Sequence, residues 1–155
     1  MAVLKIVKFD EPMIRKISRP VDEITPRIIQ LLDDMIDTMR HAGGCGLAAV
    51  QVGVLRRIVV IEIEEGVVYE MINPRIVSYS GKQEESEGCL SNPGHYGITS
   101  RPAVVTVRAT DRHGKEYELR GEGLLARAIC HECDHLDGKL YIDSQIRELS
   151  PDELA

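Results

Sequence analysis

Apolar residues recur every three or four positions between residues 25 and 41, the spacing that gathers side chains on one face of an α-helix. Thr25 suits the N-cap and Pro26 suits the first helical position. Gly43 and Gly44 follow the last apolar positions and mark the end of the helix. The pattern predicts an amphipathic scaffold helix whose buried face carries Ile28, Ile29, Leu32, Met35, Ile36 and Met39.

The region from 57 to 110 is organised differently, because β-branched runs alternate there with short turn-like segments. The runs IVVIEI, VVYEMI, RIVSY and AVVTVRA predict strands in a mainly antiparallel arrangement. Between VVTVRAT and EYELR, the segment DRHGK at 111–115 predicts a hairpin turn in which Gly114 supplies a positive φ. A second helix is expected over about 122–138. Strands placed between two helices indicate the α+β class, with antiparallel strands packed around the second helix.

Length, composition and charge narrow the class of protein. A chain of 155 residues suits one domain, so we expect residues 1–155 to form a single domain. The hydrophobic share of 43% and the charged share of 28% are typical of a globular protein. A net charge of −6 argues against nucleic acid as a partner. Lys5, Lys8 and Asp10 interrupt the N-terminal segment and no long apolar run follows, so we expect no membrane segment and a cytoplasmic location.

Two histidines of the second predicted helix, in the sequence HECDH, are the first candidates for chemistry. His131 and His135 are four residues apart, which places them about 40° apart around a helix, on one face and able to share a metal. Glu132 lies between them and is suited to take a proton from water and pass it to a departing amine. We expect this carboxylate at a half-buried position, because its side of the helix also carries Leu125, Ile129 and Leu136.

A catalytic tetrahedral site needs a third protein ligand, and Cys89 in EGCLS is the best candidate. It follows strand-like residues in a short segment from which a thiolate can face the helix, although a small buried thiol is the alternative interpretation. His41, His95 and His113 are rival ligands. His41 and His113 fit solvated surface positions, whereas His95 stays open. The remaining thiols are expected to be structural: Cys130 and Cys133 lie about 100° and 160° from the first histidine around the helix.

A third motif, GCGLAAVQ at 44–51, combines two glycines with an amide. Gly44 and Gly46 allow a close approach of the backbone to another group, and Gln51 brings a hydrogen-bonding side chain. Glycines after a helix are also common as C-caps, so this motif alone indicates little.

Taken together, GCGLAAVQ, EGCLS and HECDHLDG resemble the three signature motifs of peptide deformylases, GxGxAAxQ, EGCLS and HExDHLxG, in the expected order. The resemblance extends over about residues 5–145. It implies a metal held by Cys89, His131 and His135 with water in the fourth place, and Glu132 as general base and acid. It also implies that the Gln51 amide and the Leu90 backbone N–H stabilise the oxyanion of the tetrahedral intermediate.

The same resemblance implies a substrate, a metal and partners. The substrate is the formyl-methionine end of a nascent peptide, bound as an extended strand, with a transient ribosome contact as a further expectation. The metal is iron(II) in the cell, while zinc, nickel or cobalt suit one thiolate and two imidazoles in purified protein. Three glycines match positions along the binding groove of the family: Gly44, Gly46 and Gly88. Cys45, Leu124 and Ala128 match positions in its methionine pocket, although Leu124 and Ala128 also fit an ordinary hydrophobic core.

The sequence departs from the family pattern at three points, and two other functions are alternatives to deformylation. Cys130 stands where the family often has Gln, Asn92 follows EGCLS where an aliphatic residue is common, and the chain ends soon after Asp143. An HExxH peptidase that cuts internal bonds is one alternative, although such enzymes commonly take a third His or Glu as ligand. A non-catalytic protein with a structural metal is the other, and Glu132 argues against it, because a closed structural site needs four protein ligands and no carboxylate beside the metal.

Overall fold

The computed structural model describes residues 2–154, and its longest helix is the one predicted first. Helix α1 runs from Pro26 to His41, and the Thr25 side chain accepts a hydrogen bond from the Ile28 N–H as its N-cap. Beyond the helix, Gly43 has a φ of +73°, a conformation that favours glycine. The face predicted to be buried is buried at Leu32, Met35 and Met39.

A five-stranded antiparallel sheet packs beside α1, with strand order β1-β2-β3-β6-β7. Its strands are β1 (Gly46–Ala48), β2 (Ile58–Glu62), β3 (Val68–Ser80), β6 (Val104–Thr110) and β7 (Glu116–Glu122). The prediction of separate strands for VVYEMI and RIVSY was wrong, because both belong to β3. Register shifts after Ile72 and after Ile76 bend this strand without ending it. Asn73, with a φ of +53°, lies within the first shift.

The predicted hairpin at 111–115 is confirmed. Strands β6 and β7 are paired up to Thr110 and Glu116, and Gly114 has the expected positive φ of +81°. The Asp111 carboxylate accepts hydrogen bonds from the His113 and Lys115 N–H groups, which closes the turn. The turn therefore follows from its own residues.

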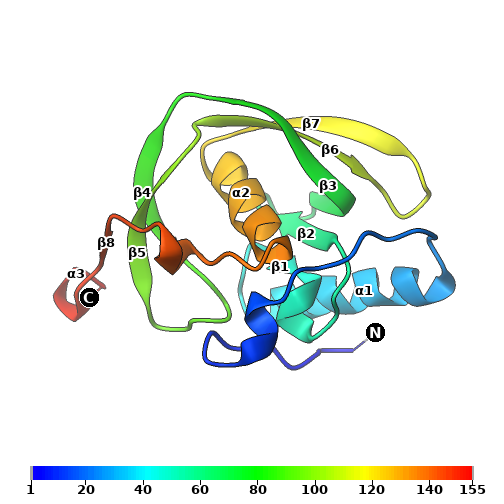
Figure 1. The fold of residues 1–155 in the computed structure, drawn as a ribbon, viewed down its shortest axis with the longest axis horizontal. Helices are drawn as coiled ribbons and strands as arrows, with labels where there is room; N and C mark the ends of the chain where they lie inside the picture. The colour runs from blue at the N-terminus through cyan, green and yellow to red at the C-terminus, as the bar shows by residue number, and fades with distance from the viewer. Residues whose placement is uncertain (1, 155) are drawn as a thin grey trace.

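A second sheet was not predicted. It contains β4 (Gln83–Gly88), β5 (Tyr96–Arg101) and β8 (Arg147–Glu148), in the order β4-β5-β8. Figure 1 shows it on one side of the molecule, beside helix α2. The chain also forms short helical turns and a short C-terminal helix: η1 (Pro12–Arg15), η2 (Ala49–Val52), η3 (Tyr141–Asp143) and α3 (Pro151–Leu154).

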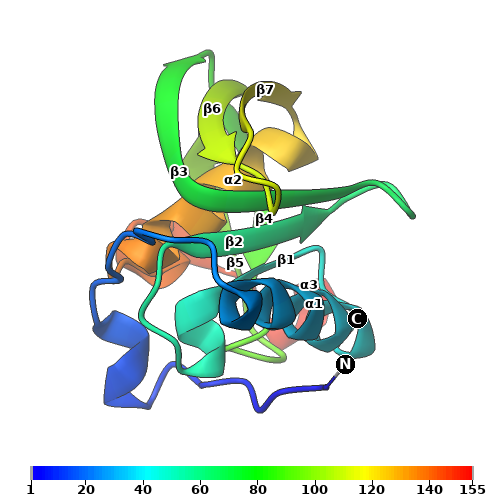
Figure 2. The ribbon, with the colours of Figure 1, turned by 90° about the vertical axis from the view of Figure 1, so that its right-hand side faces the viewer.

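Helix α2, from Leu124 to Leu136, lies in the middle of the fold and is slightly shorter than predicted (Figure 1). Figure 2 shows α1 and α2 on opposite sides of β1 and β2. Strand β2 packs against both helices from its two faces. Val59 and Ile61 lie in the hydrophobic core with α2, whereas Ile58 and Val60 lie in the core with α1. Among residues 2–154, no helix is long and apolar enough to cross a membrane. The α+β class with a central helix is confirmed.

Candidate metal centre

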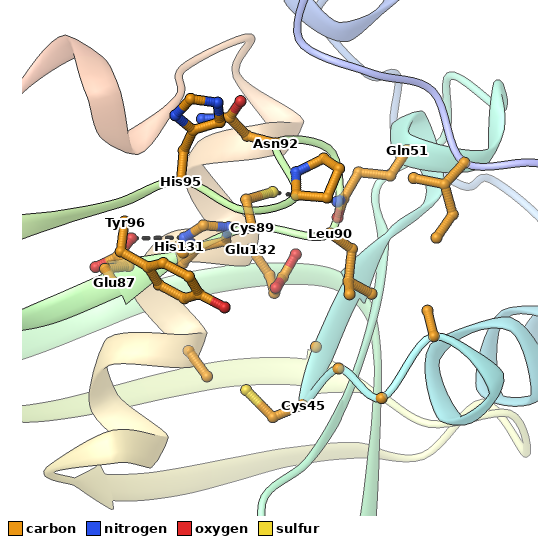
Figure 3. A pocket seen from close by; sticks show the side chains of 18 of the residues that line it. Cys45, Gln51, Glu87, Cys89, Leu90, Asn92, His95, Tyr96, His131 and Glu132 are labelled. Atoms are coloured by element: carbon orange, nitrogen blue, oxygen red, sulfur yellow. Dashed lines mark hydrogen bonds and ion pairs between the residues drawn. The ribbon is translucent and has the colours of Figure 1, made fainter. Parts of the chain in front are cut away.

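Three of the predicted site residues meet where α2 passes the end of β4. Cys89 directly follows β4, and His131 projects from α2 beside it (Figure 3). His135 lies one turn further along α2. One ligand atom from each residue lies within 4.8 Å of the other two, and Cys89 Sγ is 3.3 Å from His135 Nε2. Within residues 2–154 this is the one such group of three or more His, Cys, Asp or Glu side chains. A thiolate and two imidazoles form a donor set that suits a divalent transition metal.

The rival ligands lie elsewhere. His41 and His113 are exposed, as predicted, and the open question of His95 is resolved because its Nδ1 atom lies 3.0 Å from Glu148 on the exposed rim. Cys130 and Cys133 are not members of the cluster, in agreement with their predicted angles around the helix.

Glu132 is more deeply buried than predicted, with 4% of its surface exposed. The half-buried expectation was wrong because β1 covers the carboxylate. A Cβ atom on Gly46 of that strand would lie 2.5 Å from Glu132 Oε2, so the missing side chain makes room for the carboxylate. Burial raises the pKa of Glu132 to about 7. Its Oε1 atom is buried without a hydrogen-bond partner among residues 2–154, an orphaned acceptor beside the three candidate ligands. These residues fit a bound metal and its water.

Gln51 is held by its own helical turn. Its Oε1 atom accepts from the Ala48 N–H at 2.9 Å, and its Nε2 atom donates to Ser91 Oγ at 3.0 Å. The same Nε2 atom lies 3.4 Å from Cys89 Sγ. The amide is therefore fixed with its nitrogen beside the candidate ligand (Figure 3).

The group that orients the first histidine, His131, was not predicted from the sequence. Glu87, the first residue of EGCLS, is 5% exposed and its Oε2 atom lies 2.5 Å from His131 Nδ1. Burial alone would raise the pKa of Glu87, but hydrogen bonds from His131 and Arg101 outweigh burial and hold this pKa below its usual range. The ionised carboxylate only accepts, so a proton lies on His131 Nδ1, and Nε2 is the nitrogen that would bind a metal.

Two buried arginines complete this network and were also missed. Arg101 on β5 and Arg127 on α2 both donate to Glu87. The available signal was the position of Arg127: it stands four residues before His131 in the otherwise apolar stretch LLARAIC, and a charged residue inside such a stretch needs a partner.

A groove of about 620 Å³ opens over the cluster, and each residue predicted to contact substrate lines it. Leu124 lies at the rim with 54% of its surface exposed, whereas Ala128 is 4% exposed in the wall. Two of the predicted glycines are closely packed against neighbouring side chains. A Cβ atom added to Gly44 would lie 2.5 Å from the Leu90 side chain, and one added to Gly88 would lie 2.5 Å from Tyr96. The residues brought together along the groove are Gly44, Cys45, Gly46, Gln51, Gly88, Leu90, Leu124 and Ala128.

A buried glutamate beside a Cys–His₂ cluster, at the base of an open groove, defines the class of metal-dependent hydrolases. The sequence profile of the polypeptide deformylase family matches residues 3–150, so the chain belongs to that family. It is a peptide deformylase-type amidohydrolase, which removes the formyl group from the N-terminal formyl-methionine of newly synthesised proteins.

Relatives support this assignment over nearly the whole chain. A peptide deformylase from Alkaliphilus metalliredigens is 54% identical over 148 residues, which cover 96% of this chain and all of the relative. The crystal structure of a peptide deformylase from Legionella pneumophila is 45% identical with a TM-score of 0.90, covering 98% of this chain and 89% of that one. The structure from Ehrlichia chaffeensis in complex with actinonin is 38% identical with a TM-score of 0.91, covering 99% of this chain and 92% of that one.

Proposed function

We propose that Cys89, His131 and His135 hold the catalytic metal and that Glu132 moves the protons of the deformylation reaction. The observation that carries this proposal is the approach of the three ligand atoms to within 4.8 Å of one another, beside a buried carboxylate with an unpartnered oxygen. The metal, when bound, supplies Lewis-acid chemistry toward water and the formyl carbonyl.

The protein groups account for the proton transfers. Glu132 takes a proton from the attacking water as the new C–O bond forms, and returns it to the methionine nitrogen as the C–N bond breaks. Formate and a free N-terminal amine are the products. The Gln51 Nε2–H that lies 3.4 Å from Cys89 Sγ makes a weak contact there, so it is the donor that we assign to the substrate oxygen, together with the Leu90 N–H.

The groove suits an extended peptide bearing a methionine side chain. Gly44, Gly46 and Gly88 lie along it and bring two backbone segments to its surface. Ala128 in the wall and Cys45 and Leu124 at the exposed rim give it a lining of small and aliphatic side chains. An unbranched, polarisable methionine fits such a lining. By the same argument actinonin, which the Ehrlichia chaffeensis relative binds, occupies this groove and competes with substrate.

Formate release tests the proposed function directly. The metal-loaded protein is expected to hydrolyse formyl-Met-Ala-Ser and to leave acetyl-Met-Ala-Ser and internal peptide bonds intact, because a closely fitted oxyanion pocket has no room for the acetyl methyl group. Equal rates on the formyl and acetyl peptides would contradict the proposal. Cleavage of internal bonds would instead assign the site to an HExxH peptidase.

We propose iron(II) as the native metal. Both iron(II) and its thiolate ligand are oxidisable, so the iron-loaded enzyme is expected to lose activity in air, while nickel- or cobalt-loaded enzyme keeps it. Activity is followed over hours in air with no peroxide scavenger present. Stable activity of the iron-loaded enzyme under these conditions contradicts the proposal.

We also propose that residues 1–155 act as one catalytic domain in the cytoplasm and reach nascent chains through a transient contact with the ribosome. Support comes from the substrate itself, because formyl-methionine is present at the N-terminus while the chain is being made. Co-sedimentation of the protein with translating ribosomes, compared with empty ribosomes, tests the contact.

A further inference from the structure

Two arginine side chains meet at the carboxylate that orients His131. Glu87 is buried together with Arg101 and Arg127, and both of its carboxylate oxygens accept several hydrogen bonds. Oε1 accepts from Arg127 Nη1 at 2.8 Å, Thr99 Oγ1 at 2.7 Å and Arg101 Nε at 3.1 Å. Oε2 accepts from Arg101 Nη2 at 2.7 Å and from His131 Nδ1.

The two arginines are not equivalent. Arg101 spans both Glu87 oxygens and also bonds to Asp134 at 2.7 Å, so it has two carboxylate partners. Arg127 has one carboxylate partner, and its other bonds go to Thr99 Oγ1 and, at 3.4 Å, to Gln83 Oε1. Its charge is therefore compensated through Glu87 alone among residues 2–154.

The bonds of Arg127 join the two elements that carry the candidate ligands. Arg127 stands one helical turn before His131 on α2, while Glu87 stands two residues before Cys89 at the end of β4. Fixing the carboxylate on Arg127 therefore fixes both the His131 ring and the segment that leads to Cys89.

We propose that Arg127 is a positioning residue for the metal centre. It holds the Glu87 oxygen that does not contact His131, so the other oxygen stays on His131 Nδ1 and the thiolate of Cys89 stays at its distance from the histidine pair. The proposal rests on the ligand assignment given above and goes beyond it, because Arg127 contacts none of the three ligand side chains by a hydrogen bond among residues 2–154.

The test compares metal affinity in folded variants. Arg127→Gln keeps a polar side chain but removes the charge and the paired donors, and it is expected to lower the affinity for cobalt(II) by about 10- to 100-fold, the usual effect of losing an outer-shell partner. Affinity is measured by competition with a chromogenic chelator. The visible spectrum of the cobalt-loaded protein, which reports the geometry of the thiolate and imidazole ligands, is expected to change as well.

Arg112→Gln is the matched control. Arg112 bonds to two carboxylates, Glu70 and Asp33, and to neither Glu87 nor a candidate ligand, so this control removes an ion-paired arginine without changing a contact of the metal centre. It is expected to lower thermal stability while keeping wild-type cobalt affinity and spectrum. If Arg112→Gln lowers the affinity as much as Arg127→Gln does, affinity follows general stability and the proposal is wrong.

Arg127→Lys is the conservative variant, because it keeps the charge but cannot donate to Glu87 and Thr99 in the same geometry. Its affinity is expected to lie between wild type and Arg127→Gln. Should the Gln variant fail to fold, the Lys variant decides: reduced affinity supports the role of Arg127, and affinity within twofold of wild type overturns it. The wild type separates the two proposals, because absence of cobalt binding there would overturn the ligand assignment itself and this inference with it.

Discussion

Glu132 combines two features that a carboxylate seldom has together in a protein interior. It is almost completely buried, and its Oε1 atom has no hydrogen-bond partner among residues 2–154. A buried acceptor without a partner costs stability, which supports the role that we propose for Glu132 in the reaction. Gly46 leaves room for the other oxygen, Oε2, and Oε1 is the atom that we propose to exchange protons with water and substrate.

Replacing the carboxylate with an amide separates catalysis from binding. Glu132→Gln keeps the shape of the side chain but removes its basic oxygen, so turnover is expected to fall by about 10² to 10⁴, the usual share of general acid–base catalysis. Metal content and peptide affinity should stay near wild type. The measurement compares metal content, peptide binding and formate release side by side. A variant that keeps its metal and works within a few-fold of wild type would show that Glu132 is not the base.

A methyl group at position 46 tests the position of the same carboxylate. In Gly46→Ala the new Cβ atom would lie 2.5 Å from Glu132 Oε2, so the carboxylate must shift. A displacement of this kind costs up to about 10²-fold in rate. Metal content should be unchanged. Gly121→Ala is the control, because its Cβ atom would lie 2.8 Å from the Leu125 side chain and away from Glu132. Similar kcat losses in both variants would mean that general strain, and not Glu132, limits the rate.

At the scale of elements, helix α1 serves the fold and contributes no candidate ligand. It packs on β1 and β2 from the side opposite α2 (Figure 2). Its apolar face, its N-cap and the glycines beyond its end all agree, which is why its bounds could be predicted from sequence. A change that weakens α1 should therefore lower stability without changing the metal centre.

Thr25→Ala tests this separation. The Thr25 hydroxyl accepts a bond from the Ile28 N–H, and removing a cap of this type lowers the free energy of unfolding by about 0.5 to 2 kcal/mol. Formate release at 25 °C and metal affinity are expected to stay at wild-type values. Thr25→Ser, which keeps the hydroxyl, should recover most of the stability measured by denaturant unfolding. A drop in metal affinity in Thr25→Ala would show that α1 and the centre are coupled.

The sheet formed by β4 and β5 could not be predicted because its buried positions are polar. On these strands the inward residues include Glu87, Thr99 and Arg101, so hydrophobic alternation, the usual sign of a half-buried strand, is missing. The apolar strands β2 and β6 show the opposite case and were found. Motifs gave Cys89 and the histidines as candidates, whereas the contacts of Glu87 depend on strands whose pairing no local pattern reveals.

At the scale of the whole molecule, the candidate ligands come from both halves of the fold. Cys89 follows the three-stranded sheet, whereas His131 and His135 belong to the helix that packs on the five-stranded sheet. A bound metal therefore links segments more than 40 residues apart in the chain, given the separation of 46 between Cys89 and His135. Such a link constrains the folded state as a whole, beyond the groove.

Removal of the metal should consequently lower the stability of the entire protein. A ligand that binds only the folded state adds about 2.7 kcal/mol at a concentration 100 times its dissociation constant. Thermal unfolding of the cobalt-loaded protein is therefore expected at a clearly higher temperature than that of protein treated with a chelator. The transition should stay cooperative, because the Glu87 network joins the three-stranded sheet to α2, and α2 packs on the five-stranded sheet.

Cys89→Ser and Cys45→Ser make this prediction specific to the centre. A serine hydroxyl is a poor substitute for a thiolate toward these metals, so Cys89→Ser should bind less metal and lose most of the temperature shift between loaded and chelated protein. Cys45 lines the same groove but lies outside the ligand cluster, so Cys45→Ser should keep the full shift. The measurement is thermal unfolding of each variant with and without metal, at equal protein concentration and with metal content determined beforehand. An equal shift in unfolding temperature in Cys89→Ser and Cys45→Ser would show that the Cys89 thiolate does not bind the metal. The absence of a shift in wild type carrying one equivalent of metal would show that the centre does not join the two halves of the fold.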